Sequence, residues 1–160
     1  MVIEMTYSIS RVPWQQAAPL LKDIREKVFV CEMRIPKRIE FDINDRTAFH
    51  ILVCDDKSQK PIATGRISAT GQISRIAVVR EYRQAAIDKI VMQGLFRIAE
   101  ELALPEVFIF SPLERVDHFR EHHFYPVGAV FMEAGLPKQC MACSITTARD
   151  DVNQTKYYLR

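Results

Sequence analysis

The chain has 160 residues, of which 48% are hydrophobic and 26% are charged. This composition excludes a disordered, collagen-like or membrane-spanning chain, and no basic-then-apolar leader opens the sequence. Lys and Arg number 22 against 20 Asp and Glu, a net charge of +2, which is less basic than a dedicated nucleic-acid binder. We therefore expect one cytoplasmic domain over residues 1–160, with a peripheral tail at 146–160 and no nucleic-acid or membrane partner.

Hydrophobic periodicity predicts a mixed order of strands and helices. Apolar residues that alternate with polar ones indicate strands, and apolar residues three and four positions apart indicate helices. The expected strands are 3–9, 49–54, 62–68, 73–79, 107–110, 127–133 and 139–145, and the expected helices are 14–32, 87–102 and 112–123. On the first helix, the apolar face should hold Ala17, Leu20, Leu21, Ile24 and Val28. Pro36 should end regular structure and leave an irregular polar stretch through Arg46.

The helix at 87–102 joins two strands that should be parallel. Strands 73–79 and 107–110 are connected through it, and such crossovers are parallel and right-handed. Val107–Phe110 is a continuous apolar run, which is typical of a strand covered on both faces. Residues 134–137 should connect the last two strands. The order predicts an α/β fold with a single-layer sheet and helices on it.

Several short motifs follow one another along the chain. The first helix reads R-x-x-V-F-x-x-E, and E-x-D-x-x-D follows it. The residues concerned are Arg25, Val28, Phe29, Glu32, Glu40, Asp42 and Asp45, then Ala63-Thr64-Gly65-Arg66, Ser74-Arg75-Ile76-Ala77-Val78, and Gly135-Leu136-Pro137 with Met141. Over about residues 5–145 this set resembles small bacterial members of the GCN5-related N-acetyltransferase (GNAT) superfamily. The resemblance implies an α+β fold whose mixed, mostly antiparallel central sheet is flanked by helices and has splayed fourth and fifth strands.

The resemblance also implies where acetyl-CoA, the co-substrate, would bind. Its pantetheine would pair with free backbone of the fourth strand, and the backbone N–H of Val78 would polarise the thioester carbonyl. Its pyrophosphate would lie at the start of the long helix, where a helix N-terminus favours anions. The residues implied are Ile76, Ala77 and Val78 on the strand, and Arg83, Gln84, Ala85, Ala86, Ile87 and Asp88 in the loop.

The loop departs from the family pattern R/Q-x-x-G-x-G/A at two positions. Ala86 and Asp88 stand where the family has small residues, usually glycines. A carboxylate about 6 Å from the pyrophosphate would oppose binding by roughly 3 kcal/mol at an effective dielectric near 20. If Asp88 points to solvent instead, it stabilises the positive end of the helix dipole.

A further departure concerns the general acid. Many members carry a tyrosine on the last helix that protonates the departing thiolate, and Phe119 occupies that position here. Tyr125 or His118 is the candidate replacement, with His122 as another, or the thiolate leaves without a proton because a free thiol has a pKa near 8.5.

Glu32, Glu40 and Asp42 are the candidate residues for binding an amine substrate. For the loop acids the alternative is capping and ion pairing with Arg25 or Arg66, and the sequence favours this alternative. The same arginines and acids also resemble acyl-homoserine-lactone synthases. The chain is short for that group, and a tryptophan that precedes the acids there is absent.

The cysteines and histidines do not predict a metal site. The four cysteines, Cys31, Cys54, Cys140 and Cys143, are scattered in apolar segments and should be reduced. Cys140 and Cys143 lie in a strand pattern that turns them to opposite faces. The histidines at 118, 122 and 123 have no third ligand at familiar spacing.

Together these observations predict an acyl-CoA-dependent N-acyltransferase that moves acetyl from acetyl-CoA to an amine by direct attack. The amine could belong to a small molecule or to a protein. The alternative is a binding module with the same fold, a degenerate cofactor loop and no catalysis. Members of the superfamily are often homodimers, so the resemblance also implies a possible homodimer for this chain.

Overall fold

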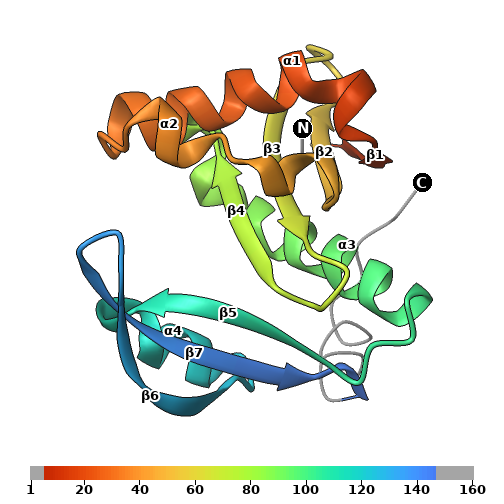
Figure 1. Ribbon diagram of the computed structural model, residues 1–160. Helices are drawn as coiled ribbons and strands as arrows, with labels where there is room; N and C mark the ends of the chain where they lie inside the picture. The colour runs from red at the N-terminus through yellow and green to blue at the C-terminus, as the bar shows by residue number, and fades with distance from the viewer. Residues whose placement is uncertain (1–5, 147–160) are drawn as a thin grey trace.

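The computed structural model describes residues 6–146, which form seven strands with helices between them (Figure 1). The elements are β1 (Tyr7–Val12), α1 (Trp14–Arg25), a π-helical segment (Glu26–Glu32), α2 (Lys37–Glu40), a 3-10 turn (Ile43–Arg46), β2 (Phe49–Asp55), β3 (Pro61–Ile67), β4 (Ile73–Val78), a 3-10 segment (Arg80–Ala85), α3 (Ile87–Glu101), β5 (Glu106–Pro112), a 3-10 turn (Leu113–Arg115), α4 (Val116–Glu121), β6 (Tyr125–Glu133) and β7 (Leu136–Ser144). Every expected strand is present in order. The expected first strand begins in residues that lie outside the described range.

The strands form two sheets instead of the single layer expected. The first sheet has the order β1-β2-β3-β4 and the second has the order β5-β7-β6, and all neighbours within each sheet are antiparallel. The two sheets meet where Gln72 forms a parallel bridge with Phe108. From that junction β4 and β5 diverge (Figure 1). The parallel relation of these strands and their splaying are therefore confirmed.

Gly71 makes the junction between the sheets possible. It has a φ of +101°, and a Cβ at this position would lie 2.9 Å from the carbonyl oxygen of Glu106. Only glycine tolerates both conditions. The Gly71 carbonyl accepts a hydrogen bond from the Phe108 N–H at 2.9 Å, so the two strands start in contact before they separate.

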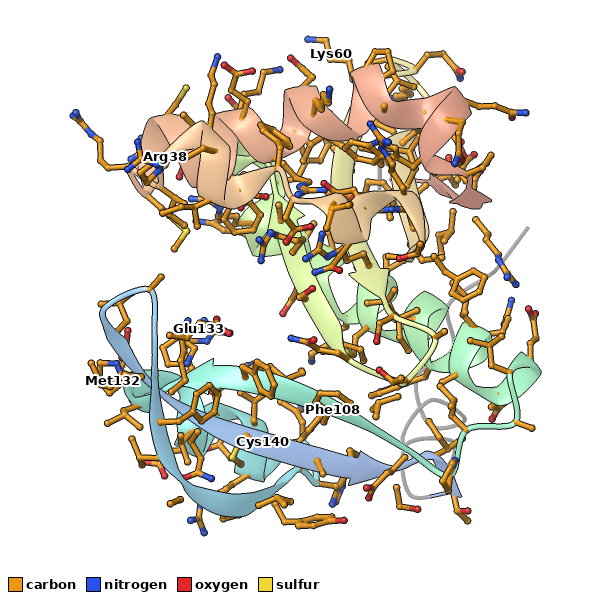
Figure 2. All side chains as sticks on the ribbon, viewed as in Figure 1. Arg38, Lys60, Phe108, Met132, Glu133 and Cys140 are labelled. Carbon is orange, nitrogen blue, oxygen red and sulfur yellow. The ribbon has the colours of Figure 1, made fainter. Side chains whose placement is uncertain are left out.

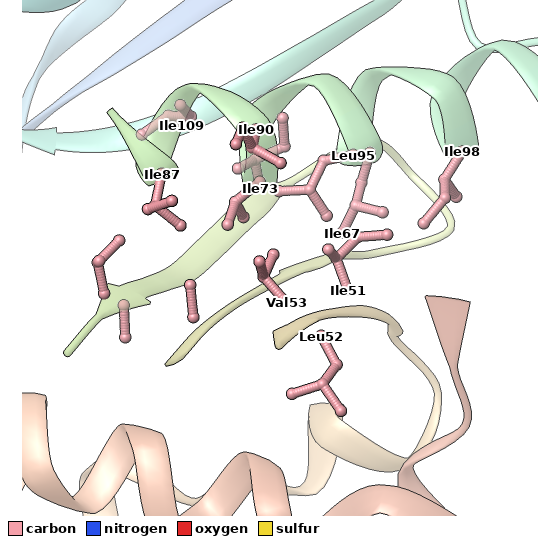
Figure 3. Packing of buried hydrophobic residues seen from close by; sticks show 14 of the residues in the cluster. Ile51, Leu52, Val53, Ile67, Ile73, Ile87, Ile90, Leu95, Ile98 and Ile109 are labelled. Carbon is pink, nitrogen blue, oxygen red and sulfur yellow. The ribbon is translucent and has the colours of Figure 1, made fainter. Parts of the chain in front are cut away.

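Helices α1 and α3 cover opposite faces of the first sheet (Figure 3). On the α3 side, a Cβ on Gly65 would lie 2.6 Å from Val91 Cγ1, and one on Gly94 would lie 3.1 Å from Ile51 Cδ1. These two glycines let the helix approach the strands closely. On the α1 side the expected face is correct except at Leu20, which is 45% exposed. Arg25 is buried in this helix instead.

Three local predictions are corrected by the structure. The stretch after Pro36 is not irregular, because α2 and a 3-10 turn occupy it. Strand β5 alternates between buried and half-buried residues, because no helix of residues 6–146 covers its second face. The last connection is a two-residue turn, Ala134–Gly135, with φ values of 50° and 79°. That geometry is typical of a tight hairpin, so Leu136 and Pro137 belong to β7.

Candidate functional site

The edge of β4 that faces away from β3 has no strand paired along it beyond Gln72 within residues 6–146. The Val79 N–H donates to the Ile62 carbonyl of β3 at 2.9 Å. Successive residues of a strand direct their backbone groups to opposite edges. Val78 therefore directs its N–H and its C=O toward the free edge, into the region where β4 and β5 separate.

A β-bulge in β4 precedes this edge. Thr64 pairs with Ala77 and Arg66 pairs with Ser74, so β4 has one residue more than β3 between these pairs. Arg75 takes up the extra length with a φ of +56°. A bulge bends its strand and increases the local twist. The bulge thus sets the direction in which the last residues of β4 leave β3.

The expected cofactor loop connects β4 to α3. Ala86 precedes the helix with φ 55° and ψ 33°, which is left-handed backbone. Ile87 is buried, whereas Gln84 and Asp88 are exposed. The loop thus keeps the backbone shape that glycine would favour. The exposed Asp88 carboxylate lies in the first turn of α3, the position that stabilises the helix dipole.

Arg83 connects two other predicted site residues, Val78 and Glu32. Its Nε donates to the Val78 carbonyl at 3.0 Å, and its Nη2 donates to Glu32 Oε1 at 2.8 Å. The same Nη2 lies 2.7 Å from Glu32 Oε2. Glu32 is the last residue of the π-helical segment. The sequence identified each of these residues but not their contact, because 51 positions separate Glu32 from Arg83.

Glu40 and Asp42 are not free to bind a ligand in this structure. Glu40 is buried, accepts a hydrogen bond from Arg25 Nε at 2.7 Å and lies 3.2 Å from Arg75 Nε. Asp42 pairs with Arg66 at 2.8 Å and with Arg75 at 3.2 Å. Its side chain also accepts from Asn44 N–H and caps the 3-10 turn. The pairing and capping that the sequence favoured are confirmed.

Asp45 joins these residues into one buried ionic network. It accepts hydrogen bonds from Arg25 Nη1 at 2.6 Å and from Arg66 Nη1 at 2.7 Å. The network, defined here as Arg25, Glu40, Asp42, Asp45, Arg66 and Arg75, holds three cations and three carboxylates. Its charges therefore balance when all six groups are ionised.

Burial and the arginines act in opposite directions on the carboxylates of this network. Burial raises the pKa of Glu40, and the charges of Arg75 and Arg25 offset only part of that rise. Burial also acts to raise the pKa of Asp42, but its hydrogen bond and charge interaction with Arg66 lower that pKa below its usual value. The network thus holds Asp42 ionised more firmly than Glu40.

His50 adjoins this network as a structural residue. Its Nε2 lies 2.8 Å from the Asp45 carbonyl oxygen, and its ring lies 5.3 Å from the Trp14 ring. Burial lowers the pKa of His50, and the charges of Arg25 and Arg66 contribute to the decrease. The neutral ring therefore contributes a hydrogen bond to the fold.

The candidate acids lie apart from Val78 or beside the cofactor loop. The Tyr125 hydroxyl donates to Glu106 at 2.9 Å, and this bond raises the pKa of Tyr125. Glu106 begins β5 at the junction of the sheets, whereas Val78 ends β4 at its splayed end. The structure therefore does not bring Tyr125 to Val78.

His118 lies on α4, with its ring 4.8 Å from that of His122. Burial lowers the pKa of His118, and the charge of Asp88 acts against this decrease. Asp88, in the first turn of α3, is thus one of the charges that act on His118. Phe119 packs against Phe124 with 5.5 Å between ring centroids and has no proton to give.

An aromatic cluster on the second sheet was not predicted as part of the site. Phe108, Phe110 and Phe131 are half-buried, with 5.7 Å between the first two ring centroids and 5.0 Å between the last two. Phe110 pairs with Cys140 of β7, and Figure 2 labels Phe108 and Cys140 on this sheet. The alternation of these phenylalanines with the buried Val107 could have revealed the open face.

Two negative observations hold for the described residues. Within residues 6–146, no group of three or more His, Cys, Asp or Glu side chains could hold a metal ion. In the same range, no helix has the length and apolar character needed to cross a membrane. Cys140 is half-buried and Cys143 is buried on the opposite face of β7, as the strand pattern indicated.

Comparisons with known proteins agree with this architecture. No family model matches the chain. It is 29% identical over 124 residues to the uncharacterized N-acetyltransferase YjcF of Bacillus subtilis, an alignment that covers 73% of this chain and 87% of that protein. The structure resembles an acyl-CoA N-acyltransferase from Pseudomonas aeruginosa, with a TM-score of 0.71, 20% identity, and coverage of 88% of this chain and 99% of that one.

A third similarity is to BjaI, a CoA-dependent acyl-homoserine lactone synthase solved with SAM and isopentyl-CoA. The TM-score is 0.75 at 15% identity, and the match covers 97% of this chain and 93% of that one. The two chains therefore match over most of their lengths, whereas the sequence alone indicated that this chain is short for that group. The chain therefore has the fold of the GCN5-related N-acetyltransferases and a curated relative that is named as an N-acetyltransferase, so the resemblance predicted from its motifs is confirmed.

Proposed function

We propose that this protein is an acyl-CoA-dependent N-acyltransferase that transfers acetyl from acetyl-CoA to an amine. The observation that carries the proposal is the free edge of β4, where Val78 directs its N–H away from β3. The N-terminus of α3 follows after one short loop. A strand edge that can pair with an extended amide chain and a helix end that favours phosphate together match the two halves of CoA.

The reaction would proceed by direct attack. The nitrogen of a neutral amine forms a bond to the thioester carbonyl carbon, and the bond from that carbon to sulfur breaks. The Val78 N–H would donate to the carbonyl oxygen as negative charge develops there. The extra proton of the acylated nitrogen passes to solvent and the sulfur leaves as a thiolate, which is feasible because a thiol has a pKa near 8.5. Much of the acceleration would come from holding amine and thioester together.

The acceptor would lie on the face of the sheets opposite α3. The aromatic cluster of Phe108, Phe110 and Phe131 makes the second sheet apolar on its open face. Glu40 and Asp42 are neutralised by arginines, which argues against a polycationic acceptor held by them. We therefore propose an amine with an apolar or aromatic body as the preferred substrate.

The loop residues are compatible with CoA despite their departures from the family pattern. Ala86 has the left-handed backbone that the family's glycine would adopt. Asp88 is exposed, so its carboxylate can point to solvent while the helix N-terminus receives phosphate. The names of the relatives, an N-acetyltransferase and an acyl-CoA N-acyltransferase, support the same activity.

Calorimetric titration with acetyl-CoA tests the proposal. We expect saturable binding and, with a panel of aromatic and aliphatic amines, release of free CoA thiol. Binding without thiol release from any amine would favour the non-catalytic binding module. Absence of binding at millimolar acetyl-CoA would overturn the proposal.

A second candidate is an acyl-homoserine-lactone-synthase-like acyltransferase. It is favoured by the similarity to BjaI over 97% of this chain. Including S-adenosylmethionine among the acceptors and a branched acyl-CoA among the donors distinguishes the two. Faster turnover with that pair than with acetyl-CoA and simple amines would favour the synthase.

A further inference from the structure

Arg83 is positioned by Glu32 and Val78 and not by burial. Tyr82 and Ala85 of the segment Arg80–Ala85 pack against the core, but no residue of the segment is buried, so packing does not fix the Arg83 side chain. The Arg83 guanidinium instead donates to the Val78 carbonyl at 3.0 Å and pairs with Glu32 at 2.7 Å. The Arg83 and Glu32 side chains are 41% and 33% exposed, and a ligand from solvent can therefore reach both.

Glu32 reaches the loop from a different layer of the molecule. It ends the π-helical segment that continues α1, in which the Met33 N–H donates to the Val28 carbonyl at 3.1 Å. A π-helical turn contains an additional residue and rotates the residues that follow it relative to an α-helix. Val28 is buried and anchors the segment. The Glu32 carboxylate is thus held beside the loop by a fixed helix end.

Bound CoA would compete with both contacts of Arg83. The Val78 carbonyl faces the same free strand edge as the Val78 N–H, and this is where an extended pantetheine amide would pair. A carboxylate and a pyrophosphate are both anions that a guanidinium binds by charge-assisted hydrogen bonds. Because one guanidinium has a limited number of donors in a fixed plane, they compete for it.

We propose that Glu32 is a competing ligand for Arg83. In the free protein Glu32 keeps this arginine across the strand edge, and the pyrophosphate of CoA must displace Glu32 to bind Arg83. The inference rests on the proposed function, because it assumes that CoA binds at this loop. Glu32 then sets the affinity for CoA and does not bind the amine. Its carboxylate also repels the phosphates once Arg83 has left it.

The experiment compares CoA affinity in Glu32→Gln with that of the parent by calorimetry at low ionic strength. We expect about two- to tenfold tighter binding in Glu32→Gln, since a partly exposed ion pair and a nearby like charge are each of modest strength. The gain should shrink at 1 M salt because screening weakens both interactions. Pantetheine, which lacks the phosphates, should show less of the gain than CoA.

Glu26→Gln is the matched control. Glu26 begins the same π-helical segment, and it pairs with Lys37 at 2.7 Å instead of with Arg83. The substitution removes the same charge from the same segment. Equal tightening in Glu26→Gln would mean that only net charge matters and would overturn the proposal.

The double variant Glu32→Gln with Arg83→Gln completes a cycle. With Arg83→Gln alone as the fourth member, removing Glu32 should tighten CoA binding less when Arg83 is already absent, because only the direct repulsion of the phosphates by Glu32 then remains. Unchanged or weaker CoA binding in Glu32→Gln, with normal binding in the parent, overturns this inference and leaves the proposed function intact. Absence of CoA binding in the parent overturns both.

Discussion

Arginine meets carboxylate in two contrasting regions of this molecule. In the buried ionic network, Arg25 and Asp45 are each 1% exposed and share a 2.6 Å contact. Beside the cofactor loop, Arg83 and Glu32 make a contact of almost the same length, 2.7 Å, with 41% and 33% of their side chains exposed. The chemistry is the same, but the surroundings give the two pairs different functions.

The difference lies in what replaces each partner when the pair breaks. A buried charge that loses its partner is not solvated by water, so separating a buried pair strongly destabilises the fold. An exposed charge exchanges its partner for water or for a ligand at little cost. The network is therefore suited to holding α2 and the 3-10 turn against β3 and β4. The Glu32–Arg83 pair is suited to yielding to an anion.

Arg25→Met should show the difference between the two regions by the largest loss of stability. It leaves Glu40 and Asp45 buried with one cation fewer, and loss of one partner from a buried pair typically lowers stability by about 3–5 kcal/mol. Urea denaturation gives the free energy of unfolding. In the same experiment Glu32→Gln should lower stability by less than about 1 kcal/mol. Similar losses in the two variants would show that burial does not distinguish the regions.

His50 should make the stability that the network contributes depend on pH. Burial lowers the folded-state pKa of His50, so below an unfolded pKa of about 6.5 the unfolded chain takes up a proton that the folded protein does not. Stability should therefore be complete above that pH and fall as the pH decreases toward the folded-state pKa. The slope for one proton is at most about 1.4 kcal/mol per pH unit.

His50→Gln tests this dependence, because the glutamine amide can still donate to the Asp45 carbonyl but does not titrate. The difference in unfolding free energy between parent and variant should change between pH 7 and pH 5. Asp45 acts to raise the pKa of His50, and the charges of Arg25 and Arg66 act with burial to lower it. A difference that is constant across this range would contradict the prediction.

Ala86→Gly should have the smallest effect on stability, and it tests the backbone conformation of the loop. Ala86 has a φ of 55°, and left-handed backbone disfavours a residue with a Cβ by about 1 kcal/mol relative to glycine. The variant should be more stable by about that amount, as measured by the urea midpoint. Ala85→Gly is the matched control, because Ala85 belongs to the preceding 3-10 segment and should gain nothing from glycine.

The sequence identified the elements well because periodicity is local. A buried helical face repeats every three to four residues and a strand face every two, whatever lies opposite. This was sufficient for α3, for the order of all seven strands and for the parallel start of β4 and β5. It was insufficient for β5. The apolar run of Val107–Phe110 predicts burial on both faces, but one face is only half-buried, and this depends on which segments pack against it.

The candidate site was predicted in composition but not in arrangement. The loop acids pair with Arg25 and Arg66 as the sequence favoured, whereas the cofactor-binding roles implied by the resemblance stay predictions. No spacing rule indicated that Arg83 would contact Glu32 or that Tyr125 would bond to Glu106. These contacts join segments that are distant along the chain.

Local pattern and side-chain type were sufficient to predict the resemblance to the superfamily, the succession of strands and helices, and the residues available for chemistry. Only the tertiary structure decided which of those residues are free. The bulge at Arg75, the close approach at Gly71 and the π-helical end at Glu32 each depend on how backbone segments meet in space. The resulting arrangement neutralises Glu40 and Asp42 within the fold. It leaves the edge at Val78 without a paired strand and places Arg83 beside that edge.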